Sequence, residues 1–526
     1  MPSTIREHRQ KVAFHLRGPI QQSLQAIAQA TGLSRSSVHR HRQAIERHRQ
    51  YPESEWWDTP VGYDWLVRLV VAVVYHFGIK QGVGAESLSD FFKAIHLQQQ
   101  VGCSASALRT LKGRLMDGII DYAAAQGEHC QPVEQQGICV GADETFFERP
   151  ILVMVELVSG FIFIETESDN RTYDTWQQQW QKRWGAYGWQ CHYLVSDAAP
   201  ALIKLALSGL GCPHVVDVFH ALRDLGRPWG RAIERQLQQV QQQVADVQQQ
   251  LKSLTEGSQR QALLLTLAQL AQQQQDWHAA QEHYRQALET IGQSLHPFEL
   301  ECQRWQLDGQ LAASLAAPLG VLSQLAQAMG SQPTRKALAT FEAQLSTWAT
   351  GIRAWRQWCE QALMQETPDP ARQSWVLHTL LPWVYWSIQL DKARQPCRQQ
   401  RYQQAASDAY DRLWAHPLTL QLSDAEVRYW RNWAVTFVAN YQRTSSAVEG
   451  RNGCLSKLHH ATRGFSAQSL EALTVIHNFD LRRADGSTAA QRLFNHEFPD
   501  LFECLLLQVG DLPLPRRSSK AQRLSG

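Results

Sequence analysis

The chain has 526 residues, of which 44% are hydrophobic, so it is long enough for two to four folded domains. The longest apolar run, Leu66–Phe77, is interrupted by Arg68 and is too short to cross a membrane, so we expect no membrane segment. The N-terminus lacks the apolar region of a secretory signal, and the ten cysteines include no CxxC pair. This composition favours a reducing cytosol over a disulfide framework or a zinc ribbon.

The formal net charge of +2 hides a basic N-terminus. Residues 1–50 contain nine Lys and Arg, two Asp and Glu, and five His. Because this charge is concentrated in one segment, it indicates contact with phosphates.

Residues 22–48 have the pattern of two helices joined by a tight turn. Gly32 suits the left-handed conformation of such a turn, and Ser34 is a suitable N-cap for the second helix. The segment resembles a helix-turn-helix with a recognition helix at Arg35–Arg47. A solvated basic helix on a helical bundle is the alternative. The first helix would bury Leu24, Ile27 and Ala28, the second would bury Val38 and Ile45, and the outer face would carry Arg35, His39, Arg40 and Arg42.

Residues 56–126 are predicted to be helical, with helices at Trp65–Phe77, Ala85–His96 and Ser104–Ala125. The last of these carries Arg109, Lys112 and Arg114 after a turn. It is therefore either a second DNA-binding unit or a plain helical connector.

Residues 135–220 contain the pattern of a mixed α/β sheet. The second and third apolar runs are joined by Val158-Ser159-Gly160, which suits a hairpin turn. Helices are predicted at Tyr173–Trp184 and Ala199–Ser208. The predicted strands are Ile138–Ala142, Ile151–Leu157, Phe161–Glu165, His192–Ser196 and Val215–Phe219.

Two aspartates are set into this pattern. Asp143 lies at the end of the first predicted strand, and Asp197 directly follows the fourth. If these strands are neighbours, the two carboxylates meet at one edge of the sheet and suit a divalent metal ion. Strand alternation alone does not eliminate Glu144, whose side chain would point to the opposite face.

Residues 231–440 are rich in Gln, Ala, Leu and Trp and predict an all-helical region. Apolar residues from Ile233 to Leu254 recur in steps of four and three, which predicts one arm of a coiled-coil hairpin that returns through Ala262–Ala271. The many tryptophans of the region are expected to be mainly core residues, although one or two could stack on an exposed base.

The segment Gln442–Phe465 reads QRTSSAVEGRNGCLSKLHHATRGF and places Glu449 at the start of a helix with Leu455 and Leu458 on its buried side. In this context, with Asn452, Lys457 and Arg463-Gly464-Phe465 following, the chain resembles the DDE transposases of bacterial insertion sequences. Their RNase H-like catalytic domain is interrupted by a helical insertion between the second Asp and the Glu.

The resemblance implies a catalytic, metal-binding triad of Asp143, Asp197 and Glu449 that holds two Mg²⁺ or Mn²⁺ ions, with Asp143 bridging them. It also implies a D-x-x-H motif at Asp217 and His220, which would support the metal carboxylates, hold a DNA phosphate or be structural. A zinc site at Cys212, His214 and His220 lacks a fourth soft ligand. Asn452 and Lys457 would be supporting residues, and Arg463 would join the basic helix in binding DNA.

The implied function is metal-dependent cleavage and strand transfer on double-stranded DNA, both element ends and target, by a homodimer or larger assembly in the bacterial cytoplasm, at the nucleoid. The alternatives are a non-enzymatic DNA-binding transposase remnant and a metal-dependent nuclease without strand transfer. The expected fold is α/β plus all-α. The predicted domains are residues 1–50 (helix-turn-helix), 51–130 (helical), 131–226 (first part of the RNase H-like core), 227–440 (helical insertion), 441–505 (second part of the core) and 506–526 (basic disordered tail).

Overall fold

The computed structural model describes residues 3–17, 22–57, 59–132, 137–185, 188–254, 256–307 and 309–515. The chain divides into two compact units. One comprises Met1–Val133 and Arg451–Gly526, and the other comprises Glu134–Gly450.

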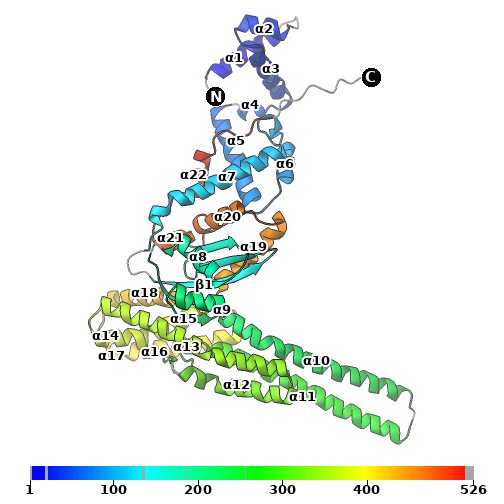
Figure 1. The fold of residues 1–526 in the computed structure, drawn as a ribbon, viewed down its shortest axis with the longest axis vertical. Coiled ribbons are helices and arrows are strands. Elements are labelled where there is room, and N and C mark those ends of the chain that lie inside the picture. Colours follow the sequence, from blue (N-terminus) through cyan, green and yellow to red (C-terminus); the bar gives the residue numbers. More distant parts are fainter. Residues whose placement is uncertain are drawn as a thin grey trace. The chain divides into compact units, whose positions relative to one another are not determined.

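Helices predominate in the described residues, and one five-stranded sheet lies in the second unit (Figure 1). The prediction of an α/β part combined with all-α parts is therefore confirmed.

The sheet has the strand order β3-β2-β1-β4-β5. Strand β2 pairs antiparallel with both β1 and β3, whereas β4 pairs parallel with both β1 and β5. The turn between β2 and β3 contains Gly160 at φ 80°, as the hairpin prediction requires. The strands are β1 (Gly137–Phe146), β2 (Pro150–Glu156), β3 (Ile162–Glu167), β4 (Gln190–Ser196) and β5 (His214–Val216).

Two predicted strand boundaries are wrong by more than two residues. Strand β1 continues to Phe146, so Asp143 lies inside it and not at its end. Strand β5 ends at Val216, because the side chain of Asp217 accepts hydrogen bonds from the backbone amides of Phe219 and His220 and starts a helix there.

The first helices of the chain are α1 (Ser3–Leu16), α2 (Leu24–Thr31) and α3 (Arg35–Gln50). Gly32 has φ 69°, and the hydroxyl of Ser34 accepts the amide of Ser37, so both turn residues act as predicted. The buried residues Val12, Ile27, Ala28 and Val38 form the core of these helices.

The rest of the first unit is also helical. Thr59 caps α5 and Pro60 occupies its first turn, so this helix starts earlier than the predicted Trp65. Tyr122 in α7 donates a hydrogen bond to the carbonyl of Pro499. The elements are α4 (Ser54–Trp57), α5 (Pro60–Val73) with a π-helical extension (Val74–Ile79), α6 (Ala85–Ala94), α7 (Ala105–Ala125), α20 (Ala467–Phe479), α21 (Ala489–Phe494) and α22 (Leu501–Gln508).

Two helical segments, Pro60–Ile79 and Gln310–Met329, match a membrane-crossing helix in length and composition. Half of the apolar window of the first and a third of that of the second are buried inside the protein. Core helices pass the same criteria, so these segments are weak evidence for a membrane.

In the second unit, α8 (Tyr173–Arg183) follows β3, while α9 (Pro200–Lys204) and its π-helical extension (Leu205–Gly209) follow β4. Two long helices, α10 (Val218–Lys252) and α11 (Ser258–Ser294), then form the predicted hairpin (Figure 1). Ile233, Leu237 and Val240 are buried in its seam.

The remaining helices of the insertion enclose an aromatic core. Trp305, Trp348, Trp355, Trp375 and Trp386 are buried, which confirms their predicted core role, whereas Trp358 and Trp383 are partly buried. The helices are α12 (Gln310–Met329), α13 (Gln332–Glu366), α14 (Pro370–Trp375), a π-helical segment (Val376–Leu380), α15 (Leu381–Lys392), α16 (Pro396–Ala415), α17 (Pro417–Gln421) and α18 (Asp424–Asn440).

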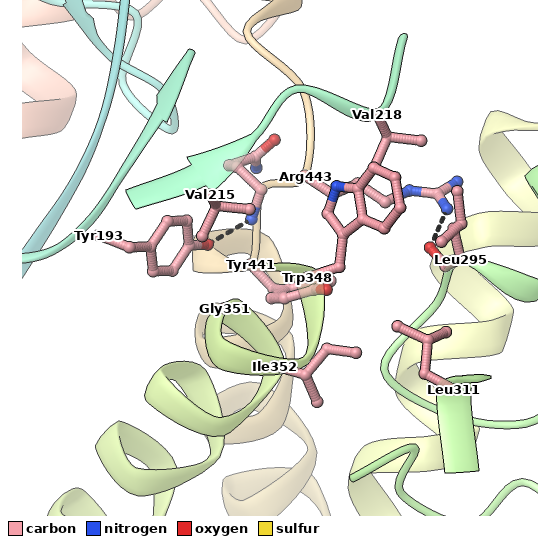
Figure 2. Close-up of a pocket in the computed structure, with 11 residues that line it drawn as sticks. Tyr193, Val215, Val218, Leu295, Leu311, Trp348, Gly351, Ile352, Tyr441 and Arg443 are labelled. Atoms are coloured by element: carbon pink, nitrogen blue, oxygen red, sulfur yellow. Dashed lines mark hydrogen bonds between the residues drawn. The ribbon is translucent and has the colours of Figure 1, made fainter. Parts of the chain in front are cut away.

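A small pocket marks the place where the insertion meets the sheet (Figure 2). The indole of Trp348 in α13 donates a hydrogen bond to the carbonyl of Val216, next to Val215 in the pocket wall. On the returning chain, the amide of Gln442 donates to the hydroxyl of Tyr193 at 2.7 Å, and Arg443 donates to the carbonyl of Leu295. The segment after α18 is thus fixed before α19 (Ser446–Thr462) begins.

The described part of the predicted C-terminal tail is anchored. The carbonyl of Pro513 accepts the amide of Gly102, and Leu512 is buried. Residues 516–526 of the predicted tail lie outside the described residues.

Gly351 allows α13 to approach β5, because a Cβ atom there would lie 2.7 Å from Cγ2 of Val215. We expect Gly351→Ala to lower the free energy of unfolding by about 1–3 kcal/mol through overpacking. Gly320→Ala in α12 is the matched control, since no atom lies within 4 Å of its added Cβ, and it should stabilise by up to about 1 kcal/mol. Urea denaturation followed by tryptophan fluorescence measures both, and equal shifts would contradict the proposed close approach.

Candidate metal centre

The site is built at the junction of β1 and β4. These strands are parallel neighbours, with Gly141 opposite Val195, so the condition for bringing Asp143 toward Asp197 is met. Asp143 lies two residues farther along β1, and Asp197 directly follows the last residue of β4. The sheet therefore places both aspartates in one region.

The structure brings Asp143 together with His220 and Glu449. One ligand atom from each side chain lies within 4.8 Å of the others, which is a spacing that can hold a metal ion. Asp143 comes from β1, His220 from the first turn of α10 and Glu449 from the first turn of α19. Three segments that are far apart in the sequence thus converge.

Asp217 fixes two of these three segments. Its Oδ1 accepts the amides of Phe219 and His220 at 2.6 and 3.0 Å, which starts α10. Its Oδ2 accepts both the amide and the hydroxyl of Ser445 at 2.5 Å, immediately before α19. The residue is only 1% exposed, and both of its oxygens accept hydrogen bonds from the protein itself. Of its three predicted roles, this geometry favours the structural one.

Glu449 is oriented by His220. The Nε2 atom of His220 lies 2.5 Å from Oε1 of Glu449, and the His220 side chain is 12% exposed. Since an ionised carboxylate only accepts, Nε2 carries the proton and Nδ1 accepts from Arg223 at 3.5 Å. One oxygen of Glu449 is thereby held in place, in the manner of an outer-shell partner of a metal ligand.

Asp197 lies near this cluster but outside the closest group. It is exposed, and its Oδ1 accepts the amide of Ala199 at 3.0 Å. The pKa of Asp143 is raised to about 6, mainly by burial and also by the negative charges of Asp197 and Glu449, while the backbone amide of Glu144 and the His220 ring act in the opposite direction. The ionised carboxylates would repel one another, and a bound cation would reduce this repulsion.

Glu144 belongs to a different environment. Its side chain is only 2% exposed and lies 3.5 Å from Arg171. Burial raises the pKa of Glu144, and the charge of Asp197 adds to the effect, while Arg171 lowers it. Glu144 is not part of the Asp143 group, so the predicted alternation of side chains along the strand is consistent with the structure.

The remaining predicted site residues lie in the first unit. Asn452 is partly buried and Lys457 is exposed, both on α19, and Arg463 is exposed at φ 59°. On α3, Arg35, His39 and Arg40 are exposed, while Arg42 pairs with Glu46 at 2.9 Å.

Two exposed basic residues of the possible second DNA-binding helix, α7, contact other residues of the protein. Arg109 pairs with Glu86, and Arg114 donates to the carbonyl of Asp511. Burial lowers the pKa of Lys112. These contacts favour the connector role over a DNA-binding role.

The contacts of the other soft ligands do not favour zinc. His214 lies 2.7 Å from the hydroxyl of Ser196, and burial lowers its pKa to about 4, while Cys212 is buried. Neither residue joins His220 in the metal-binding group. The residue that sequence reasoning missed is Ser445, whose amide and hydroxyl donate to Asp217 over a distance in sequence that no local pattern indicates.

Comparison with known proteins adds one match. A family described as a family of unknown function, DUF6399, matches residues 376–521. This region contains Glu449 but neither Asp143 nor Asp197. No curated protein and no solved structure matches the chain.

Asp217→Asn should destabilise the second unit by about 2–4 kcal/mol, because the new amide group cannot accept from Ser445 and leaves buried donors unpaired. Thermal denaturation measures the loss. Asp224→Asn is the matched control on the same helix, since Asp224 is exposed. Equal melting temperatures for the two variants would show that Asp217 does not join the two helix starts.

Asp143→Asn should stabilise the metal-free protein. The folded pKa of Asp143, about 6, lies above its unfolded value near 3.8, so stability decreases as pH rises between these values and the loss is complete above about 6. The gain from the substitution should therefore be small at pH 4 and reach up to about 3 kcal/mol at pH 8. Melting curves of both proteins in EDTA test this, and a gain that does not grow with pH would contradict the raised pKa.

Proposed function

We propose that this protein is a DDE-type transposase that cleaves and joins DNA with the carboxylates of Asp143, Asp197 and Glu449. The observation that carries the proposal is the convergence of Asp143 with Glu449 and His220, although His220 and Glu449 lie 229 positions apart in the sequence. A helical insertion separates the two segments, as the resemblance to insertion-sequence transposases implies.

The sheet supports an RNase H-like core. Three antiparallel strands are followed by two parallel ones in the order β3-β2-β1-β4-β5, and the acidic residues sit on and after the two central neighbours β1 and β4. A fold does not fix a function, so the proposal rests on the side chains at this junction and not on the sheet alone.

The donor set fits hard divalent cations. Carboxylate oxygens of Asp143 and Glu449 lie close together, Asp197 is near enough to raise the pKa of Asp143, and the carboxylates repel one another without a counter-ion. When bound, two Mg²⁺ or Mn²⁺ ions would stabilise the attacking and leaving oxygens of a displacement at phosphorus.

The protein residues themselves carry out positioning. His220 holds one oxygen of Glu449, and Asp217 holds the backbone at the starts of the two helices that carry them. Asp143 is fixed within a paired strand. Such rigid placement is what an in-line displacement requires, since small errors in the position of reacting groups cost large factors in rate.

The helices α2 and α3 are proposed as a helix-turn-helix that binds the element ends. Their turn has the left-handed Gly32 and the Ser34 cap, and α3 exposes Arg35, His39 and Arg40. The proposed partners are double-stranded DNA, both ends and target, and a second copy of the chain. The proposed location is the bacterial cytoplasm, at the nucleoid.

The test is an assay of the full-length protein with Mg²⁺ and the DNA that flanks its reading frame. We expect cleavage at the element ends and strand-transfer products. Asp143→Ala and Glu449→Ala should each lower both activities by at least about a thousandfold while end binding persists. Asp174→Ala is the control, because Asp174 is exposed on α8 and outside the cluster.

The other outcomes separate the alternatives. Cleavage without joining would favour a nuclease. End binding with no cleavage by either the wild-type protein or Asp143→Ala would contradict the enzymatic proposal and favour a non-enzymatic DNA-binding protein.

A further inference from the structure

A second cavity lies within the helical insertion. It has a volume of about 280 Å³, close to the lower end of the range for small-molecule pockets. None of the described residues that line it is an Asp or a Glu. The lining residues come from the π-helical segment, α15, α16 and the start of α17, and they are His378, Thr379, Pro382, Ala409, Arg412, Ala415, His416 and Pro417.

Arg412 supplies a permanent positive charge to this cavity. Its Nη1 donates to the carbonyl of Cys302, and its Nε lies 3.4 Å from the carbonyl of Asp408. Both partners are backbone oxygens, so the guanidinium charge is not neutralised by these contacts. A guanidinium has five N–H donors, and these two bonds leave donors that can meet the oxygens of an anion.

The two histidines are each fixed in one tautomer by a neighbouring backbone group. Nδ1 of His416 accepts the amide of Leu418 at 3.2 Å, so Nε2 carries the proton and can donate. Nδ1 of His378 lies 3.0 Å from the carbonyl of Ser374 and therefore carries the proton, which leaves Nε2 to accept from a protonated oxygen.

We propose that this cavity binds a phosphate group. His378 comes from the π-helical segment, Arg412 from the last turn of α16, and His416 from the link between α16 and α17, and all three line the same space. A tetrahedral phosphate offers oxygens in several directions to donors from several side chains, whereas a carboxylate offers two oxygens in one plane. The phosphate can belong to a DNA backbone or to a small phosphorylated molecule. This site is separate from the Asp143 cluster and does not rest on the proposed function.

The experiment uses the full-length protein and inorganic phosphate, titrated at constant ionic strength against chloride and followed by ³¹P NMR and calorimetry. We expect saturable binding to the wild-type protein. Arg412→Gln and His378→Ala should each weaken it by about tenfold or more, as expected for the loss of a hydrogen bond to a charged group. Arg394→Gln is the control, because Arg394 is exposed and does not line the cavity.

Melting curves without phosphate show whether each variant is folded. If Arg412→Gln does not fold, His378→Ala still tests the proposal, because His378 is exposed and its loss should not disturb folding. A wild-type protein that shows no saturable binding, or folded variants that bind phosphate as tightly as the wild type, would overturn the proposal. Displacement of bound phosphate by a short DNA duplex would assign the site to the DNA backbone, and displacement only by nucleotides would assign it to a small phosphorylated molecule.

Discussion

The arrangement of the site depends on one buried carboxylate. Asp217 accepts four hydrogen bonds, two from the start of α10 and two from Ser445, which lies 228 positions away. Its own amide donates to the carbonyl of Ser196 at the end of β4. A buried carboxylate is stable only when its oxygens are fully hydrogen-bonded, so the positions of the groups that donate to Asp217 are closely restricted. The strand that precedes Asp197, the helix of His220 and the helix of Glu449 are thereby tied to one point.

The insertion has to return the chain to that point after more than two hundred residues. Trp348 holds α13 against the carbonyl of Val216, and Tyr193 accepts the amide of Gln442 as the chain leaves α18 (Figure 2). The amide of Val218 then donates to the carbonyl of Arg443. Aromatic side chains and backbone groups thus fix the returning chain before it reaches Glu449.

Local patterns in the sequence predict much of this arrangement. The turn at Gly32, the hairpin at Gly160 and the heptad seam from Ile233 follow from local backbone and periodicity rules. The end of β5 was missed because Val218 and Phe219 continue an apolar run, and only the capping role of Asp217 reveals that a helix starts there. Similarly, the spacing of Asp143 and Asp197 suggested a carboxylate pair, whereas the closer grouping with His220 arises from long-range hydrogen bonds that no local pattern encodes.

The hydrogen bonds of Asp217 bring Asp143 and Glu449 together in an arrangement that we propose binds a cation. The most direct test is a crystal structure of the full chain soaked with Mn²⁺, with anomalous diffraction used to locate the ion. We expect an anomalous peak about 2.0–2.3 Å from carboxylate oxygens of both residues, with His220 still hydrogen-bonded to Glu449. An ordered Asp143 and Glu449 at millimolar Mn²⁺ without any peak between them would contradict it.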